Sequence, residues 1–209
     1  MSTLEEFYNS CCNRIDDIHE HLPTLKKYAS ESNSIAEFGV RGGDSSSALL
    51  LGLKENANGI TKAYFGVDIN DCPITENMKQ FAASNQIEYT FIKSDSASVT
   101  IPDVDLLFID SWHVYAHLIR ELNNSCDKVA KYILMHDTTV DEWDGESIRC
   151  GWDVASQSKK TGYPKEEIAK GLWPAIEDFL KAHSEWKIKE RFTNNNGLTI
   201  LERVDTNEV

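Results

Sequence analysis

The sequence of 209 residues contains no long apolar run, and this absence limits what the protein can do. No stretch approaches the roughly 18–20 apolar residues that a membrane-spanning helix needs. The opening residues, MSTLEEFY, lack the basic and apolar regions of a secretory signal peptide. The sequence therefore predicts no membrane partner, and we expect a cytoplasmic protein.

Positive charge is also scarce. The chain has 21 Lys and Arg residues against 34 Asp and Glu residues, and its formal net charge is −13. Because so acidic a surface repels phosphate backbones, we expect no general nucleic-acid surface.

Cysteines in a metal or disulfide pattern are absent. The five cysteines are scattered and show no C-x-x-C spacing. This predicts neither a disulfide framework nor a zinc site, and it suits a reducing compartment.

What the sequence does contain is an apolar segment that runs into a glycine turn, SIAEFGVRGGDSSSA, over residues 34–48. Ile35 and Phe38 suit a buried strand, and Asp44 is a candidate N-cap for the helix that follows. Glycines let a ligand lie against the backbone, and the first N–H groups of the helix point at it. The pattern predicts a nucleotide-like cofactor at the carboxyl edge of a parallel sheet.

The spacing of the glycines favours one cofactor over another. A dinucleotide fingerprint reads G-x-G-x-x-G, whereas Gly39, Gly42 and Gly43 read G-x-x-G-G. Glu37 precedes them, and a carboxylate suits a ligand with ammonium and sulfonium charges better than it suits a pyrophosphate. S-adenosylmethionine is therefore favoured over NAD, and an ordinary turn without a ligand is the alternative.

Four further segments read as buried strands that end in polar residues. They cover residues 63–69, 88–93, 104–110 and 131–135. Asp68 lies at the end of the first, where a carboxylate can accept both hydroxyls of a ribose. Asp95 and Ser96 follow the second, where an acid can accept a bond from an adenine amino group.

The ends of the last two of these strands present Asp110 and His113, and His136 and Asp137. Carboxylates with an imidazole can hold Mg²⁺ or Mn²⁺, which can polarise a substrate hydroxyl. The alternative is that His136 and Asp137 only stabilise a loop. His113 is a candidate general base, because a histidine pKa lies near neutrality, or else a structural histidine tied to the next helix.

Two other segments flank this core. Residues 3–29 read as helical with a break at Pro23, and we expect His19 and His21 to face solvent. Residues 141–170 are irregular and polar in composition, which is typical of a lid or a binding loop. Its aromatic residues suit either an acceptor pocket or a dimer contact.

The last two predicted strands, residues 186–192 and 198–203, are joined by a turn with Asn196-Gly197, which indicates an antiparallel hairpin. The chain resembles the class I S-adenosylmethionine-dependent methyltransferases over about residues 34–203. This resemblance is carried by the hairpin, the EFGVRGG turn, the acid of GVDI, the KSDS loop and the acid of LLFID. LFIDSWHVY and ILMHDT resemble a subgroup with macrolide-sugar O-methyltransferases and cephalosporin-biosynthesis proteins. Ser111-Trp112 stands where that subgroup has Gly-Asp.

The resemblance implies a Rossmann-like α/β fold, with a seven-stranded, mostly parallel sheet, helices on both faces and a C-terminal antiparallel hairpin. Residues 1–33 would be an N-terminal helical extension and residues 34–209 the methyltransferase domain, with residues 141–170 as its lid or substrate loop. The implied activity is O-methylation of a small molecule, assisted by a divalent metal, in a chain that can form homo-oligomers. A catalytically silent cofactor-binding scaffold and an NAD-linked oxidoreductase are the alternatives.

Position by position, the resemblance also implies residue roles. Asp110 and His113 would be catalytic, and Asp110, His136 and Asp137 would hold the metal. Glu37 and the glycine turn would face the methionine portion, Asp68 the ribose, and Asp95 and Ser96 the adenine. The predicted cofactor-binding residues are Glu37, Gly39, Val40, Arg41, Gly42, Gly43, Ser45, Asp68, Ile69, Asp95, Ser96, Asp110 and His113.

Overall fold

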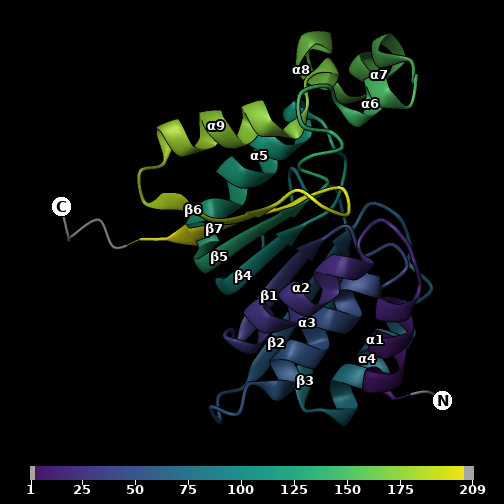
Figure 1. The fold of residues 1–209 in the computed structure, drawn as a ribbon, viewed down its shortest axis with the longest axis vertical. Helices are drawn as coiled ribbons and strands as arrows, with labels where there is room; N and C mark the ends of the chain where they lie inside the picture. Colours follow the sequence, from purple (N-terminus) through teal and green to yellow (C-terminus); the bar gives the residue numbers. More distant parts are fainter. Residues whose placement is uncertain (1–2, 205–209) are drawn as a thin grey trace.

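A seven-stranded sheet runs through the molecule in the order β3-β2-β1-β4-β5-β7-β6 (Figure 1). This computed structural model describes residues 3–204. The parallel strands are β1 (Ser34–Phe38), β2 (Lys62–Asp68), β3 (Ile87–Lys93), β4 (Val104–Ile109) and β5 (Val129–His136). The hairpin of β6 (Trp186–Phe192) and β7 (Leu198–Arg203) completes the sheet, with β7 antiparallel to β5. The predicted sheet and its C-terminal hairpin are confirmed.

Helices cover both faces of the sheet (Figure 1). One face carries α1 (Leu4–Asn13), α2 (Leu22–Ser30), α3 (Asp44–Glu55) and α4 (Thr75–Ser84), and the other carries α5 (Tyr115–Ser125) and α9 (Leu172–Ala182). Successive strand residues point to opposite faces, so Ile35 belongs to one core and Ala36 to the other. Burial on both faces explains why these strands read as continuous apolar runs.

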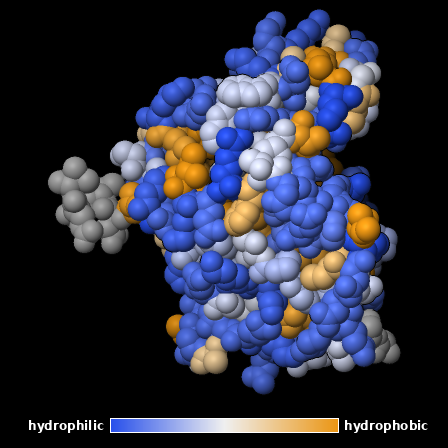
Figure 2. Space-filling model, viewed as in Figure 1, coloured by the Kyte–Doolittle hydropathy of each residue, from blue (hydrophilic) through white to orange (hydrophobic). Residues whose placement is uncertain are grey.

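Polar residues make up most of the surface visible in Figure 2, although several others are buried. Figure 2 shows one face of the molecule that is mostly hydrophilic, with apolar residues in small separate groups. Within residues 3–204, no helix combines the length and the apolar character needed to cross a bilayer.

The N-terminal region contains two α-helices, and the predicted break at Pro23 lies at the start of the second. A short 3₁₀ helix, η1 (His19–His21), separates α1 from α2, and Pro23 lies in the first turn of α2, where its missing N–H costs nothing. The prediction for His21 was wrong, because the side chain is buried. Its Nε2 lies 2.9 Å from the carbonyl oxygen of Asn194 and 3.1 Å from that of Asn195, in the hairpin turn.

Residues 141–170 are more regular than their composition predicts. They contain α6 (Glu146–Arg149), α7 (Val154–Thr161) and α8 (Lys165–Ala169), which lie beyond one end of α5 and α9 (Figure 1). Ile168 of α8 packs in a small apolar cluster with Val114 and Ala116 at the start of α5. The expectation of an irregular loop was therefore wrong in this detail, because helices of one or two turns leave little periodicity to detect.

Candidate functional site

The turn after β1 is shaped by its backbone. Gly39 has a φ of +92°, and a Cβ at this position would lie 1.9 Å from the carbonyl oxygen of Asp110. Only glycine fits such a close approach. The backbone N–H groups of Val40 and Arg41 both donate to Oδ2 of Asp68, at 3.1 Å each. The acid at the end of β2 thus holds the glycine turn of β1.

The side chain of Glu37 is fully buried beneath this turn. Its carboxylate accepts hydrogen bonds from the hydroxyls of Ser45, Ser46 and Tyr64. Burial raises the pKa of Glu37 to about 7, although the three hydroxyls favour its charged form. Glu37 therefore fixes the start of α3.

The N-cap of α3 differs from the prediction by one residue. Gly43, with a φ of +81°, occupies the cap position, and Asp44 is the first helical residue. A glycine adopts this left-handed conformation without strain, which frees Asp44 to pair with Arg14.

A cavity of about 500 Å³ opens at the carboxyl ends of the parallel strands. Seven predicted cofactor-binding residues line it: Gly39, Arg41, Asp68, Ile69, Asp95, Ser96 and Asp110. A second cavity of about 440 Å³ shares Gly39, Arg41 and Asp110 with the first. Val40, Gly42 and Ser45 line the second cavity, together with Arg14, Asp16 and Asp17 of the N-terminal region. Glu37, Gly43 and His113 line neither cavity.

The larger cavity also has walls outside the predicted set. Trp112 comes from the segment between β4 and α5, and His117 comes from the first turn of α5. Glu146, Trp152, Thr161 and Tyr163 come from residues 141–170. The rings of Trp112 and Tyr163 are nearly parallel, with 18° between their planes and 6.2 Å between their centroids. The aromatic composition of residues 141–170 was the only sequence signal for this wall.

His117 and Glu121 form a buried pair in this wall. Nε2 of His117 lies 3.3 Å from Oε1 of Glu121 and 3.0 Å from the hydroxyl of Ser96, and Ser111 donates to the same carboxylate at 2.6 Å. Burial alone would lower the pKa of His117, but the charge and hydrogen bond of Glu121, together with the charge of Asp95, outweigh it and the pKa is raised. Burial alone would raise the pKa of Glu121, but His117 outweighs it and the pKa is lowered.

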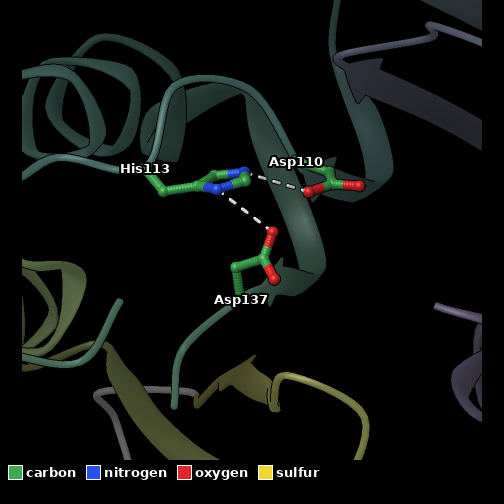
Figure 3. A group of neighbouring side chains, drawn as sticks. All are labelled: Asp110, His113 and Asp137. Atoms are coloured by element: carbon green, nitrogen blue, oxygen red, sulfur yellow. Dashed lines mark hydrogen bonds and ion pairs between the residues drawn. The ribbon is translucent and has the colours of Figure 1, made fainter. Parts of the chain in front are cut away.

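A second histidine–carboxylate cluster lies behind Asp110. Figure 3 shows the imidazole of His113 between two carboxylates, with Nε2 3.2 Å from Asp110 and Nδ1 3.1 Å from Asp137. Asp141 lies 3.3 Å from Nδ1 and also accepts two hydrogen bonds from Arg149, at 2.6 and 2.9 Å. Burial alone would lower the pKa of His113, but the surrounding acids raise it well above its ordinary value. His113 is therefore a cation in this arrangement.

The predicted metal residues meet in this cluster. Nδ1 of His136 lies 3.4 Å from Asp110 and 3.5 Å from Asp137. Within residues 3–204, Nδ1 of His136 and Oδ1 of Asp137 are buried without a hydrogen bond. Asp110, His113 and Asp137 each offer one ligand atom within 4.8 Å of the others. Two carboxylates and an imidazole are suitable ligands for a divalent cation, so these residues fit a metal.

A family model matches the part of the chain that carries these strand ends. Residues 36–138 match the family model described as a methyltransferase domain, and the match spans the glycine turn, Asp68, Asp110 and His136-Asp137. Together with the fold, this match shows an S-adenosylmethionine-dependent methyltransferase. It leaves the NAD-linked oxidoreductase without support. No curated protein matches the sequence.

Solved structures resemble this methyltransferase over nearly its whole length. A putative caffeoyl-CoA O-methyltransferase from Staphylococcus aureus is 14% identical, with a TM-score of 0.56 over 98% of this chain and 93% of that one. An O-methyltransferase from Bacillus cereus in complex with SAH is 12% identical, with a TM-score of 0.55 over 98% and 91%. The O-methyltransferase TomG from Streptomyces achromogenes in complex with SAM is 11% identical, with a TM-score of 0.52 over 97% and 89%. At these identities the similarity shows the shared fold.

Proposed function

We propose that this methyltransferase transfers the methyl group of S-adenosylmethionine to a hydroxyl of a small molecule. The observation that carries the proposal is the larger cavity, where Asp68, Asp95 and Asp110 come from three different strand ends. The cofactor has an ammonium group, a sulfonium charge and two ribose hydroxyls, all of which carboxylates can receive. The O-methyltransferases of B. cereus and S. achromogenes bind SAH and SAM in the same fold, which supports this choice.

The second cavity is the proposed acceptor site. It meets the first at Asp110, so a molecule in it can reach the end of the cofactor where the methyl group is transferred. Arg14, Asp16 and Asp17 give it a polar wall of mixed charge. A wall of this kind suits a hydroxylated small molecule better than an apolar one.

The reaction depends above all on the alignment of the acceptor oxygen with the methyl group that is transferred. Methyl transfer is an in-line displacement, and correct placement of the reacting atoms can remove roughly 7–11 kcal/mol of the barrier at the extreme. Asp110 faces the cavity and can orient the acceptor hydroxyl, while His113 and His136 hold its carboxylate from behind. These contacts fix the direction from which the hydroxyl approaches.

The same cluster determines how the hydroxyl loses its proton. Asp110, Asp137 and one of the two histidines would hold a divalent ion, which when bound lowers the pKa of a hydroxyl that it ligates. His113 reaches the cavity only through Asp110, and as a cation it stabilises negative charge there. It becomes a general base only in its neutral form.

Ligand-induced stabilisation tests the proposal. A ligand at 100 times its Kd stabilises the native state by about 2.7 kcal/mol, which raises the Tm of a protein of this size by about 5–10 °C. We expect S-adenosylhomocysteine to produce this shift and Asp68→Ala to remove most of it. The matched control is Asp71→Ala, an exposed acid of the same loop, which should keep the shift. A wild-type Tm that does not respond to the ligand would overturn the proposal.

A further inference from the structure

We propose that Trp112 and Tyr163 hold the adenine base of the cofactor, so that residues 141–170 complete the cofactor site. The inference rests on the proposed function, because it takes the ligand of the larger cavity to be S-adenosylmethionine. It assigns Tyr163 to the cofactor, although the sequence suggested that the aromatic residues of this segment serve an acceptor or a dimer contact.

The aromatic wall is built from two distant parts of the chain. Trp112 follows β4, and Tyr163 follows α7, yet both line the larger cavity with their ring planes only 18° apart. A flat base can stack on two faces of the same orientation. Stacking of a base on an aromatic side chain changes affinity by roughly 5–150-fold.

Polar groups of the kind that a base requires lie in the same wall. The carboxylate of Asp95 is 45% exposed and lines the cavity, where it can accept from an exocyclic amino group. His117 lines the cavity as well, and within residues 3–204 its buried Nδ1 has no hydrogen-bond partner. A binding site of apolar faces with a few convergent polar groups is typical for a small planar ligand.

The position of Tyr163 is fixed from outside the cavity. The guanidinium carbon of Arg120 lies 4.2 Å from the centroid of the Tyr163 ring. Arg120 belongs to α5, and it also donates to Glu167 of α8 at 3.0 Å. The arginine therefore ties the ring to both helices, and we assign it the role of a positioning residue for Tyr163.

Titration calorimetry with S-adenosylhomocysteine tests the role of Tyr163. Tyr163→Ala should weaken binding by about tenfold, and Tyr163→Phe, which keeps the ring, should bind within about twofold of wild type. Tyr163→Leu keeps apolar volume without a π face and should lose affinity at an unchanged Tm. Tyr115→Ala is the matched control, a half-buried tyrosine of α5 that lines neither cavity, and it should bind as wild type does.

A double-mutant comparison tests Arg120. Arg120→Met should weaken binding about threefold in the wild-type background and should have no further effect in the Tyr163→Ala background. Glu167→Gln removes the other partner of Arg120 and serves as its control, with binding close to wild type.

The outcomes separate the two proposals. No binding heat from the wild-type protein would overturn the proposed function itself. Wild-type binding together with unchanged affinity in Tyr163→Ala or Tyr163→Leu would overturn only the adenine assignment. An increased KM for the acceptor at unchanged S-adenosylhomocysteine affinity would assign the ring to the acceptor and would also overturn it.

Discussion

His113 and His117 lie on either side of the N-terminus of α5, and both are surrounded by carboxylates, yet they face different parts of the site. His113 has Asp110, Asp137 and Asp141 within 3.3 Å of its ring nitrogens and lines neither cavity. His117 has Glu121 at 3.3 Å and Asp95 at 4.0 Å, and it lines the larger cavity.

The difference lies in how many partners each ring has. Both nitrogens of His113 are close to acids, so the ring is held from two sides and serves to balance their charge. In His117 only Nε2 lies within 4.0 Å of a carboxylate among the described residues. The number of ring nitrogens that face carboxylates therefore distinguishes His113, which organises the cluster behind Asp110, from His117.

Asp141→Ala should break the His113 cluster and give the largest effect on stability. Asp141 is fully buried and pairs with both His113 and Arg149, so its loss removes one of the acids around His113 and the carboxylate that accepts two hydrogen bonds from Arg149. We expect the free energy of unfolding to fall by about 3–5 kcal/mol, measured by urea denaturation. The adjacent Glu142→Ala removes a partly exposed ion pair with Arg191 and should cost less than about 1 kcal/mol. Equal losses in the two variants would contradict the role given to Asp141.

Glu37 sharpens the comparison, because it is a buried carboxyl held by hydroxyls without a histidine. Its pKa rises from 4.5 to about 7 on folding, so the folded state binds more protons between these values. Stability contributed by this group is therefore lost as the pH rises from 4.5 to 7, by about 3 kcal/mol at most.

Glu37→Gln should flatten that part of the stability curve. Urea denaturation at pH 5, 6, 7 and 8 measures the slope, and the exposed Glu76→Gln of α4 should leave it unchanged. The interpretation fails if the slope of Glu37→Gln equals that of wild type.

Glu121→Gln should give the smallest of the three effects and test the His117 side of the comparison. Because the pKa of His117 is raised, the stability that His117 contributes is complete below pH 6.5 and is lost as the pH rises. Because the pKa of Glu121 is lowered, the stability that Glu121 contributes is lost on acidification. We expect a cost of about 2 kcal/mol near pH 6 that shrinks at higher pH.

An NMR titration measures this directly, because the pKa of His117 should fall in Glu121→Gln. The exposed Glu177→Gln of α9 is the control. A His117 pKa that does not move would show that Glu121 is not its charge partner.

The sheet and the strand-end acids could be predicted because burial and position decide them. The central strands β1 and β4 are covered on both faces and are largely apolar, and Asp110 directly follows β4. Asp68 ends β2 and Asp95 follows β3, two strands of mixed burial. Long-range contacts could not be predicted in this way. His21 is buried by a hairpin turn more than 170 residues away, and Tyr163 meets Trp112 only because α8 packs on α5.

The side-chain contacts inside the site could also not be predicted from the sequence. Glu37 lies in a strand and can face either side, and only the positions of Ser45, Ser46 and Tyr64 show that it points inward to hydroxyls. The spacing of His117 and Glu121 is that of countless exposed helix pairs, so it gave no sign of a cavity. Local sequence patterns predict the helices and strands, whereas contacts between residues distant in the sequence determine where the side chains point.

The insertion of β7 between β5 and β6 affects when activity can first appear. A growing chain folds from its N-terminal part onward as it leaves the ribosome. β5 gains its second neighbour, and His136 its contact with the carbonyl oxygen of Asn195, only after the hairpin has emerged. A nascent chain that already has its glycine turn and its first strands therefore still lacks these two contacts, and we expect its activity only after the last strand has joined the sheet.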